Sequence, residues 1–275
     1  MPITDTPLRY PGGKTQLLPL VIDILKKNDL IYGEYAEPFA GGSGIAISLL
    51  LNDYVSKIYL NDLDPSIYSF WHSVINQPKE LCRLIEKTDV TIEEWHRQKR
   101  ILANQQKYGS LKIGFATLFL NRTNRSGIIK GGVIGGLDQS GSYKLDCRFN
   151  KSDLIRKINR IADHGSRIEL SMLDAEIFIK KIIPKTAKNA FINIDPPYFC
   201  KGSGLYTSFY KPDDHASLAS KVSKIKRKWM VTYDDVDEIR DLYSNFPMYT
   251  KNLQYSAQEK RIGVELLIAS KELYI

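Results

Sequence analysis

The feature that most constrains the fold of this chain is an alternation of helix-like and strand-like segments near its start. Helix-like segments repeat apolar residues three or four positions apart, whereas strand-like segments are short apolar runs. We predict, in order, a helix at 15–27, a strand at 35–39, a helix at 43–52, a strand at 57–60 and a helix from 65 onward. Strands that alternate with helices build parallel sheets, so an α/β fold is predicted.

The alternation stops near residue 76 and resumes near residue 167. The later part predicts strands at 167–172, 190–194 and 229–233, helices at 175–183, 213–227 and 236–243, and closing strands at 249–255 and 264–269. Asp213 or Asp214 is expected to cap the helix at 213–227, because carboxylates accept hydrogen bonds from the free N–H groups of a helix start. The sheet is therefore predicted to be mostly parallel, with a C-terminal antiparallel hairpin.

The segment between the two alternating parts is polar and basic. From Trp95 to Leu170 there are 15 Lys and Arg against 5 Asp and Glu, and the rest of the chain has 24 against 26. The net charge of +8 thus comes from this one segment. A concentrated basic segment is typical of nucleic-acid binding, although a solvated surface has the same composition. The six glycines of 127–141 predict a loop or hairpin.

Length and composition exclude several classes of protein. With 275 residues, 43% hydrophobic and 25% charged, the chain suits one large globular domain with an insertion or two modest domains. No apolar run approaches the ~18 residues of a membrane span, and the start lacks the pattern of a signal peptide. The three cysteines lie far apart and the four histidines form no cluster. We expect a cytoplasmic protein with no membrane contact, disulfide or metal.

A glycine-rich turn follows the first predicted strand. Gly41, Gly42 and Gly44 stand between that strand and the next helix, where glycine permits a tight turn and a close approach of a ligand to the backbone. The turn is neither a dinucleotide GxGxxG nor a phosphate-binding Walker loop. Asp62 ends the next strand, where dinucleotide-binding folds place the acid that holds ribose hydroxyls. The pattern favours a nucleoside without a phosphate over an ordinary turn.

The tetrapeptide Asp195-Pro196-Pro197-Tyr198 directly follows an apolar strand. The carboxyl ends of strands line the ligand crevice of an open α/β sheet, and prolines fix the direction of a loop there. Two prolines also remove two N–H donors, so the loop offers hydrogen-bond acceptors beside an aromatic ring. Such a loop suits a planar ring with an exocyclic amino group, as in adenine or cytosine. The other interpretation is a buried turn with a capping Asp.

Taken together, these motifs resemble those of the Dam-type DNA adenine N6-methyltransferases, which use S-adenosylmethionine. Leu8 to Lys14 is similar to the opening cofactor motif of that family, Glu37 to Gly44 to its glycine motif, and Asn61-Asp62 to its ribose-binding acid. Residues 195–198 resemble its catalytic tetrapeptide, residues 119–122 the start of its target-recognition region, and residues 265–268 its last strand. The motifs occur in the order of the family over nearly the whole chain.

The resemblance implies a Rossmann-like class I methyltransferase sheet with S-adenosylmethionine as cofactor and no metal. It assigns the catalytic role to Asp195, Pro196, Pro197 and Tyr198, with Tyr198 stacking on a flipped adenine. The residues that it assigns to the cofactor are Tyr10, Lys14, Glu37, Phe39, Gly41, Gly42, Asp62, Asp174 and Asp195. Tyr206, Phe209 and Tyr210 are aromatic residues that could wall the pocket for the target base.

The resemblance also divides the chain. Residues 1–75 and 168–275 are expected to form the catalytic domain, and residues 76–167 a basic insertion of helices and loops that recognises double-stranded DNA. The expected DNA contacts are Arg122, Asn124, Arg125, Lys130, Lys144 and Arg148. The segment 123–132 does not match GATC-reading members, so the target sequence stays open. So do cytosine N4 or structured RNA as acceptor and a catalytically idle DNA-binding subunit; a monomer is expected.

Overall fold

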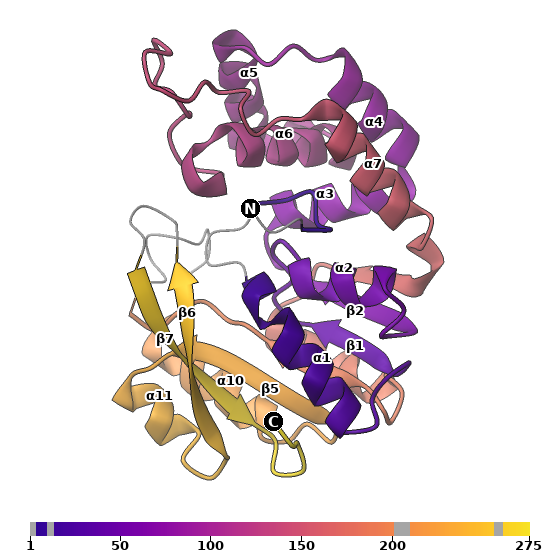
Figure 1. The fold of residues 1–275 in the computed structure, drawn as a ribbon, viewed down its shortest axis with the longest axis vertical. Helices are drawn as coiled ribbons and strands as arrows, with labels where there is room; N and C mark the ends of the chain where they lie inside the picture. The colour runs from indigo at the N-terminus through magenta and orange to yellow at the C-terminus, as the bar shows by residue number, and fades with distance from the viewer. Residues whose placement is uncertain (1–3, 10–13, 201–209, 256–260) are drawn as a thin grey trace.

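A seven-stranded sheet forms the centre of the molecule (Figure 1). The computed structural model describes residues 4–9, 14–200, 210–255 and 261–275. The strands are β1 (Glu34–Glu37), β2 (Lys57–Asn61), β3 (Ile168–Ser171), β4 (Phe191–Ile194), β5 (Lys228–Asp234), β6 (Met248–Tyr255) and β7 (Arg261–Ala269). Their order is β3-β2-β1-β4-β5-β7-β6. Strands β1 to β5 are parallel, and β7 lies antiparallel between β5 and β6. The predicted Rossmann-like fold with a C-terminal antiparallel hairpin is confirmed.

The helices predicted outside residues 76–167 are present in the predicted order. The helices are α1 (Leu18–Lys27), α2 (Gly44–Leu51), α3 (Pro65–Asn76), α4 (Pro78–Lys87), α5 (Ile92–Ala103), α6 (Ser110–Thr123), α7 (Lys151–Ala162), α8 (Ala175–Lys181), α10 (Pro212–Val222) and α11 (Asp237–Leu242), and α4 to α7 lie within residues 76–167. Short 3-10 turns complete the description: η1 (Lys14–Leu17), η2 (Gln105–Lys107), η3 (Arg125–Gly127), η4 (Gly165–Arg167) and η5 (Ile183–Lys185).

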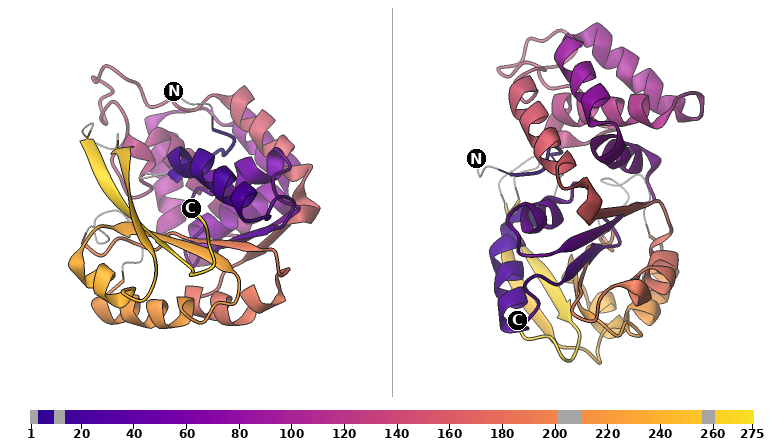
Figure 2. Two further views of the ribbon diagram at one scale, coloured as in Figure 1. Left: turned by 60° about the horizontal axis from the view of Figure 1, so that its bottom comes forward. Right: turned by 90° about the vertical axis from the view of Figure 1, so that its right-hand side faces the viewer.

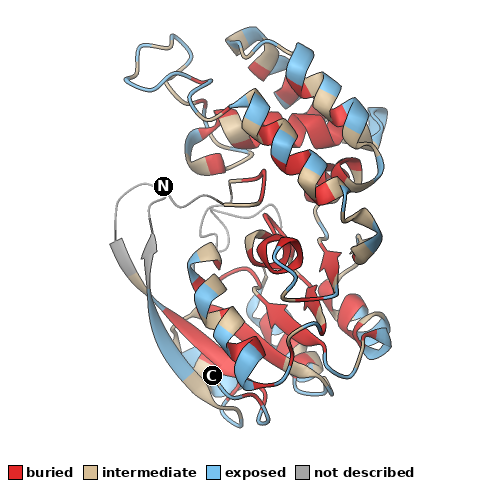
Figure 3. Cartoon of the chain, turned by 45° about the vertical axis from the view of Figure 1, so that its right-hand side comes forward, coloured by how far each residue is buried: buried red, intermediate tan, exposed pale blue. Residues whose placement is uncertain are grey.

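Each face of the sheet has its own hydrophobic cluster, because successive residues of a strand point to opposite faces. Tyr35 and Ile58 pack with α1, α2 and α3 on one face, whereas their neighbours Ala36 and Tyr59 pack with α8, α10 and α11 on the other. Figure 2 shows helices on both sides of the sheet. In Figure 3 the central strands β1, β2, β4 and β5 are buried along most of their length, whereas the described part of β6 is mostly exposed and the helices present exposed outer surfaces.

The segment 76–167 is mainly helical, as predicted, and Figure 1 shows α4 to α7 gathered at one end of the molecule. Helix α6 is its centre: the aromatic side chains of Phe115 and Phe119 are buried, and the Thr117 hydroxyl bonds to the Ser66 carbonyl of α3. Its apolar side chains belong to the same cluster as α1, α2 and α3. None of the helices in the described ranges is long and apolar enough to cross a membrane.

Two local predictions need correction. Helix α10 ends at Val222 instead of residue 227, because the chain turns there and the Ile225 N–H bonds to the Val222 carbonyl at 3.0 Å. Its N-cap is Lys211, and Asp214 contributes from inside the first turn by accepting the Lys211 backbone N–H at 2.8 Å. The glycine-rich stretch 127–141 is a run of turns, as predicted, joined to the end of α6 by a bridge between Asn124 and Val133.

Candidate active site

The predicted site residues gather where the parallel strands end. Strand β1 lies between β2 and β4, and the chain reverses its direction of sheet growth between β1 and β4. Ligands of open α/β sheets bind at such a switch point, outside the carboxyl ends of the strands. Glu37 ends β1, Asp62 follows β2 and Asp195 follows β4. Three carboxyl groups from distant parts of the sequence therefore meet at one edge of the sheet.

The turn after β1 is held by hydrogen bonds on several sides. Gly41 has a positive φ of 46°, a conformation that favours glycine, and its N–H donates to Asp62 Oδ2 at 2.8 Å. The Trp71 indole donates to the Gly41 carbonyl at 2.9 Å, and the Thr6 hydroxyl to the Gly42 carbonyl at 2.6 Å. The glycine turn and Asp62, which were predicted to hold one nucleoside, are thus joined by a direct bond. Nothing in the sequence pattern pointed to Thr6 or Trp71.

Asp62 is a partly exposed carboxylate in a constrained position. Its Oδ1 accepts the Asp64 N–H at 2.9 Å, so each oxygen has one backbone donor. Burial outweighs these two bonds and raises the pKa of Asp62 to about 6. The neighbouring Asn61 side chain donates to the carbonyls of Pro38 and Leu173, which ties the ends of β1 and β3 to β2. Asp62 is therefore fixed in direction.

Glu37 is a buried carboxyl, 6% exposed, at the last position of β1. The Tyr35 hydroxyl donates to Glu37 Oε1 at 3.0 Å. Burial raises the pKa of the Glu37 carboxyl from an ordinary 4.5 to about 8, and the negative Asp195 adds to this increase. Glu37 is consequently protonated at neutral pH in the absence of a cation beside it.

The tetrapeptide presents one occupied and one open carboxylate oxygen. Asp195 Oδ1 accepts the Thr232 hydroxyl at 2.6 Å and lies 3.4 Å from Lys14 Nζ. Within the described residues, no donor reaches Asp195 Oδ2 or the Pro196 carbonyl oxygen. The Asp195 side chain is 27% exposed, whereas Pro196 and Pro197 are buried. Two acceptors of the predicted loop, Asp195 Oδ2 and the Pro196 carbonyl, thus have no donor among the described residues.

Tyr198 and Lys14 meet over a buried glutamate. Lys14 Nζ donates to Glu265 Oε2 at 2.6 Å and to the Tyr198 hydroxyl at 3.0 Å, and the Tyr198 hydroxyl donates to Glu265 Oε1 at 2.5 Å. The Lys14 and Glu265 side chains are only 6% and 1% exposed. The structure thus places Lys14, which was predicted to bind the cofactor, against the tetrapeptide. Glu265 was found in the sequence only as part of the last strand.

Strand β5 anchors the tetrapeptide from a second side. The two oxygens of Asp234 accept the backbone N–H groups of Phe199 at 2.9 Å and Cys200 at 3.0 Å. Thr232, two residues earlier on the same strand, holds Asp195. Neither residue was predicted, because a threonine and an aspartate in and after an apolar strand have no distinctive pattern.

Phe39 and Asp174, two further predicted cofactor residues, lie along the same edge, after β1 and β3. The Phe39 ring packs edge-on against Tyr210, with centroids 5.8 Å apart, so Tyr210 lies beside a predicted cofactor residue. Asp174 caps α8 by accepting the Glu176 and Ile177 N–H groups at 2.9 and 3.3 Å. Tyr10, Tyr206 and Phe209 lie outside the described residues.

The predicted DNA contacts of the helical segment separate into two groups. Asn124 is fully buried: it accepts the Trp95 indole N–H at 2.6 Å and donates to the Ile128 and Ile129 carbonyls. Arg122 is half-buried and bonds to the Pro7 carbonyl, and burial lowers its pKa to about 10. Both side chains stabilise the local structure.

The other four predicted contacts lie nearer the surface. Arg125 and Lys130 are exposed, Lys144 is exposed and bonds to the Gln139 carbonyl, and Arg148 is half-buried with its guanidinium 5.9 Å from the Tyr143 ring.

A comparison with known protein families identifies the family of the chain. Residues 10–257 match the D12 class N6 adenine-specific DNA methyltransferases. The chain belongs to this family. The match covers the Lys14 motif, the glycine turn and the tetrapeptide in one alignment. The resemblance noted from the separate motifs is thereby confirmed.

Individual relatives of this family member are distant. The modification methylase StsI of Streptococcus sanguinis is 24% identical over 208 residues, which cover 70% of this chain and 28% of that protein. The chain thus spans about a quarter of that relative's length.

Similar solved structures include a putative RNA methyltransferase, PH1948, from Pyrococcus horikoshii, with a TM-score of 0.44 and 10% identity over 95% of this chain and 84% of that one. TrmK of M. capricolum in complex with S-adenosylhomocysteine has a TM-score of 0.39 and 8% identity over 92% and 69% of the two chains. The fold assignment follows from the strand order of this chain.

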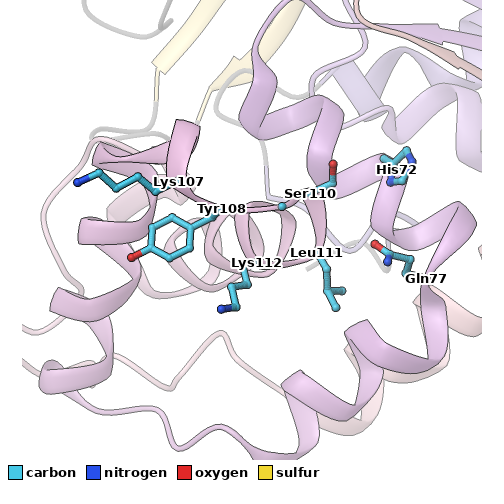
Figure 4. A pocket seen from close by; sticks show the side chains of 8 residues that line it. His72, Gln77, Lys107, Tyr108, Ser110, Leu111 and Lys112 are labelled. Atoms are coloured by element: carbon cyan, nitrogen blue, oxygen red, sulfur yellow. The ribbon is translucent and has the colours of Figure 1, made fainter.

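A pocket away from the tetrapeptide lies at the start of α6. It has a volume of about 410 Å³ and lies between the end of α3 and the turn at 107–110 (Figure 4). Its side chains include His72, Lys107, Tyr108 and Lys112, none of which belongs to the predicted site of this methyltransferase family member. Among the described residues, no three His, Cys, Asp or Glu side chains form a group that could hold a metal ion.

Proposed function

We propose that this protein transfers a methyl group from S-adenosylmethionine to the exocyclic N6 of adenine in double-stranded DNA. The observation that carries the proposal is a pair of acceptors at the tetrapeptide, Asp195 Oδ2 and the Pro196 carbonyl, that have no donor among the described residues. An exocyclic amino group has two N–H donors, and this pair can accept both. Membership of the N6 adenine-specific family supports adenine as the base and DNA as the substrate.

The two acceptors are proposed to have two effects on the amino nitrogen of adenine. The amino nitrogen of adenine is a poor nucleophile, because its lone pair is delocalised into the ring. Acceptors aimed at both N–H groups favour a pyramidal nitrogen and stabilise the positive charge that develops on it during in-line transfer. The Thr232 hydroxyl at 2.6 Å and the prolines fix the acceptors in advance. Holding both reactants in attack geometry can contribute about 7–11 kcal/mol, so positioning is expected to dominate.

The residues at the ends of β1 and β2, next to the tetrapeptide along the strand edge, suit the proposed cofactor. S-adenosylmethionine supplies an electrophilic methyl group on a positive sulfonium and also carries a ribose, an adenine and an ammonium group. Asp62, fixed by two backbone donors, is placed to accept from ribose hydroxyls, and the Gly41 turn lets a ligand approach the backbone. Glu37 offers a buried carboxyl to a cation, and Phe39 offers a ring face or edge to the adenine. The donor set therefore fits a cationic nucleoside.

A base within a duplex cannot reach the tetrapeptide, so we propose that the target adenine is flipped out, at a cost of about a few kcal/mol. Tyr198 is proposed to stack on it. Residues 76–167 are proposed to bind the DNA, with contacts from Arg125, Lys130, Lys144 and Arg148, whereas Arg122 and Asn124 act mainly through the structure of the segment. The protein is proposed to act as a monomer in the cytoplasm.

The test is product analysis with labelled cofactor and mixed-sequence duplex DNA. Wild-type protein should yield N6-methyladenine, and Asp195→Ala should yield none while it still binds the cofactor in calorimetry. The Thr232→Val variant keeps the shape of its side chain but frees Asp195 Oδ1, so an intermediate rate is expected. Methylation by Asp195→Ala at the wild-type rate, or N4-methylcytosine as the product, would overturn the proposal. Sequencing the methylated sites then gives the target.

A further inference from the structure

We propose that Glu265 is a positioning residue for methyl transfer, which holds Tyr198 and Lys14 in their places beside Asp195. This inference rests on the proposed function and adds to it a residue of β7 that contacts neither base nor cofactor. Glu265 lies opposite Asp234 in the register of β5 and β7, so it faces the tetrapeptide from the antiparallel part of the sheet.

Both oxygens of Glu265 are used within the site. Oε1 accepts the Tyr198 hydroxyl at 2.5 Å and Oε2 accepts Lys14 Nζ at 2.6 Å. A carboxylate that is 1% exposed is costly unless it is paired, so the cation of Lys14 is needed to keep Glu265 inside the fold. The ring of Tyr198 is thereby fixed at its far end by Glu265, while its backbone is fixed by the two prolines. Because the Tyr198 ring is held at its hydroxyl and at its backbone, it presents its face to a stacked base in one fixed direction.

The charge arrangement gives Glu265 a second effect. Lys14 Nζ lies between two carboxylates, at 2.6 Å from Glu265 Oε2 and at 3.4 Å from Asp195 Oδ1. Glu265 thus draws the ammonium group away from Asp195. Without the charge of Glu265, Asp195 is the remaining carboxylate that pairs with Lys14 among the described residues, and the ammonium group would move closer to it. An ammonium group bound more tightly at Asp195 would compete with the amino group of the base.

Three residues from two adjacent strands therefore support one loop. Thr232 holds the Asp195 carboxylate, Asp234 holds the two N–H groups after Tyr198, and Glu265 holds the Tyr198 hydroxyl. Supporting side chains on strands keep reacting groups in the productive geometry, and a displacement of about 1 Å can cost about 100-fold in rate. Glu265 differs from Thr232 and Asp234 because it also fixes the position of the positively charged Lys14 ammonium group.

The experiment compares Glu265→Gln with wild type on a duplex that carries the identified target site. Single-turnover rates, the dissociation constants for cofactor and DNA, and the melting temperature are measured for each protein. We expect a rate about 100-fold lower and a much smaller change in either dissociation constant, because the variant displaces Tyr198 and Lys14 but leaves the Gly41 turn and its bond to Asp62 intact. Glu169→Gln is the matched control: it removes a half-exposed glutamate that pairs with Lys57 at 2.7 Å, and the rate should not change.

A wild-type rate in Glu265→Gln overturns the inference. So does a loss of rate in which both affinities and the melting temperature fall together, since that pattern marks a purely structural residue. If the Gln variant does not fold, Glu265→Asp carries the same test, because it keeps the buried charge but cannot reach both Tyr198 and Lys14. Wild-type protein without methylation activity would refute the proposed function itself, and the positioning role with it; an active wild type with an equally active variant refutes the positioning role alone.

Discussion

Replacing Glu37 by Gln should stabilise the folded protein at neutral and alkaline pH. Glu37 is buried, and its pKa in the folded protein is about 8 against an ordinary 4.5. A carboxyl with a raised pKa keeps its proton in the folded state while the unfolded chain releases it. Stability from this group is therefore greatest below pH 4.5 and falls as the pH rises to about 8. Gln keeps an acceptor for the Tyr35 hydroxyl and has no proton to lose.

The magnitude follows from the two pKa values. One pKa unit corresponds to about 1.4 kcal/mol, so retaining the proton on Glu37 costs the wild type about 3 kcal/mol of stability at pH 7. At pH 5 the same cost is below about 1 kcal/mol, and at pH 8 it is about 4 kcal/mol. The advantage of Glu37→Gln over wild type should therefore grow by about 3 kcal/mol between pH 5 and pH 8. Any constant effect of the substitution cancels from this difference.

Urea unfolding of both proteins at pH 5, 6, 7 and 8 measures this difference directly. Asp62 titrates in the same range, with a pKa of about 6, but it is present in both proteins and its contribution cancels when their environments are equal. Glu169→Gln serves again as the control, because its side chain is half-exposed and the difference from wild type should not vary with pH. The reasoning is refuted if Glu37→Gln and wild type keep the same difference in unfolding free energy at all four pH values.

Three further changes test the packing and the DNA contacts. Gly44→Ala places a Cβ 2.6 Å from Thr15 Oγ1, so thermal unfolding should show a loss of about 1–3 kcal/mol that Thr15→Ala in the same chain largely restores. Asn124→Ala removes the bonds of Asn124 to the Trp95 indole N–H and to the carbonyls of Ile128 and Ile129, of which the Ile128 carbonyl keeps the Gly131 N–H, and should cost about 1–3 kcal/mol of unfolding free energy; an unchanged stability would contradict its structural role. Arg125→Ala should weaken DNA binding and reduce its salt slope by about 1, whereas exposed Lys26→Ala should leave the slope as in wild type.

Periodicity was sufficient to predict the sheet and most of the helices outside residues 76–167, because β1, β2, β4 and β5 are apolar runs buried on both faces and helices such as α1 bury one face. It was less reliable for the ends of elements. The helix predicted at 213–227 included Ile225 because that residue continues the apolar spacing after Val222. In the structure Ile225 does pack on the cluster of α8, α10 and α11, but it reaches that cluster from a turn. The prediction that Ile225 packs on the core was correct, but the prediction that it lies in a helix was wrong.

Site residues could be predicted where a strand ends beside them in the sequence. Asp62 and Asp195 follow apolar strands directly, and the topology of a parallel sheet brings such positions together. Thr232 and Glu265 could not be found in this way, since each is a single polar residue inside an apolar strand. Their roles come from contacts between segments 37 and 67 residues apart, such as Thr232 with Asp195 and Glu265 with Tyr198.

A short segment near the start of the chain connects the proposed cofactor site with the proposed DNA-binding segment. Residues 4–9 carry no periodic pattern, yet they connect the glycine turn to the helical segment. The Thr6 hydroxyl bonds to the Gly42 carbonyl, and one residue later the Pro7 carbonyl accepts from Arg122 of α6. The backbone of Arg9 exchanges two hydrogen bonds with the Asn121 side chain, at 2.7 and 2.6 Å.

The glycine turn therefore bonds to Thr6, and helix α6 bonds to Arg9, three residues later on the same short segment. The strand edge gathers carboxyl groups, which suits a cationic cofactor, whereas the helical segment carries the excess of Lys and Arg, which suits a polyanion. A displacement of α6 must move Pro7 and Arg9, and with them the hydroxyl that holds the Gly42 carbonyl. These oppositely charged regions are thus linked by hydrogen bonds that each use a backbone group of one partner and the hydroxyl, guanidinium or amide of the other. No charge pattern in the sequence can indicate such a link.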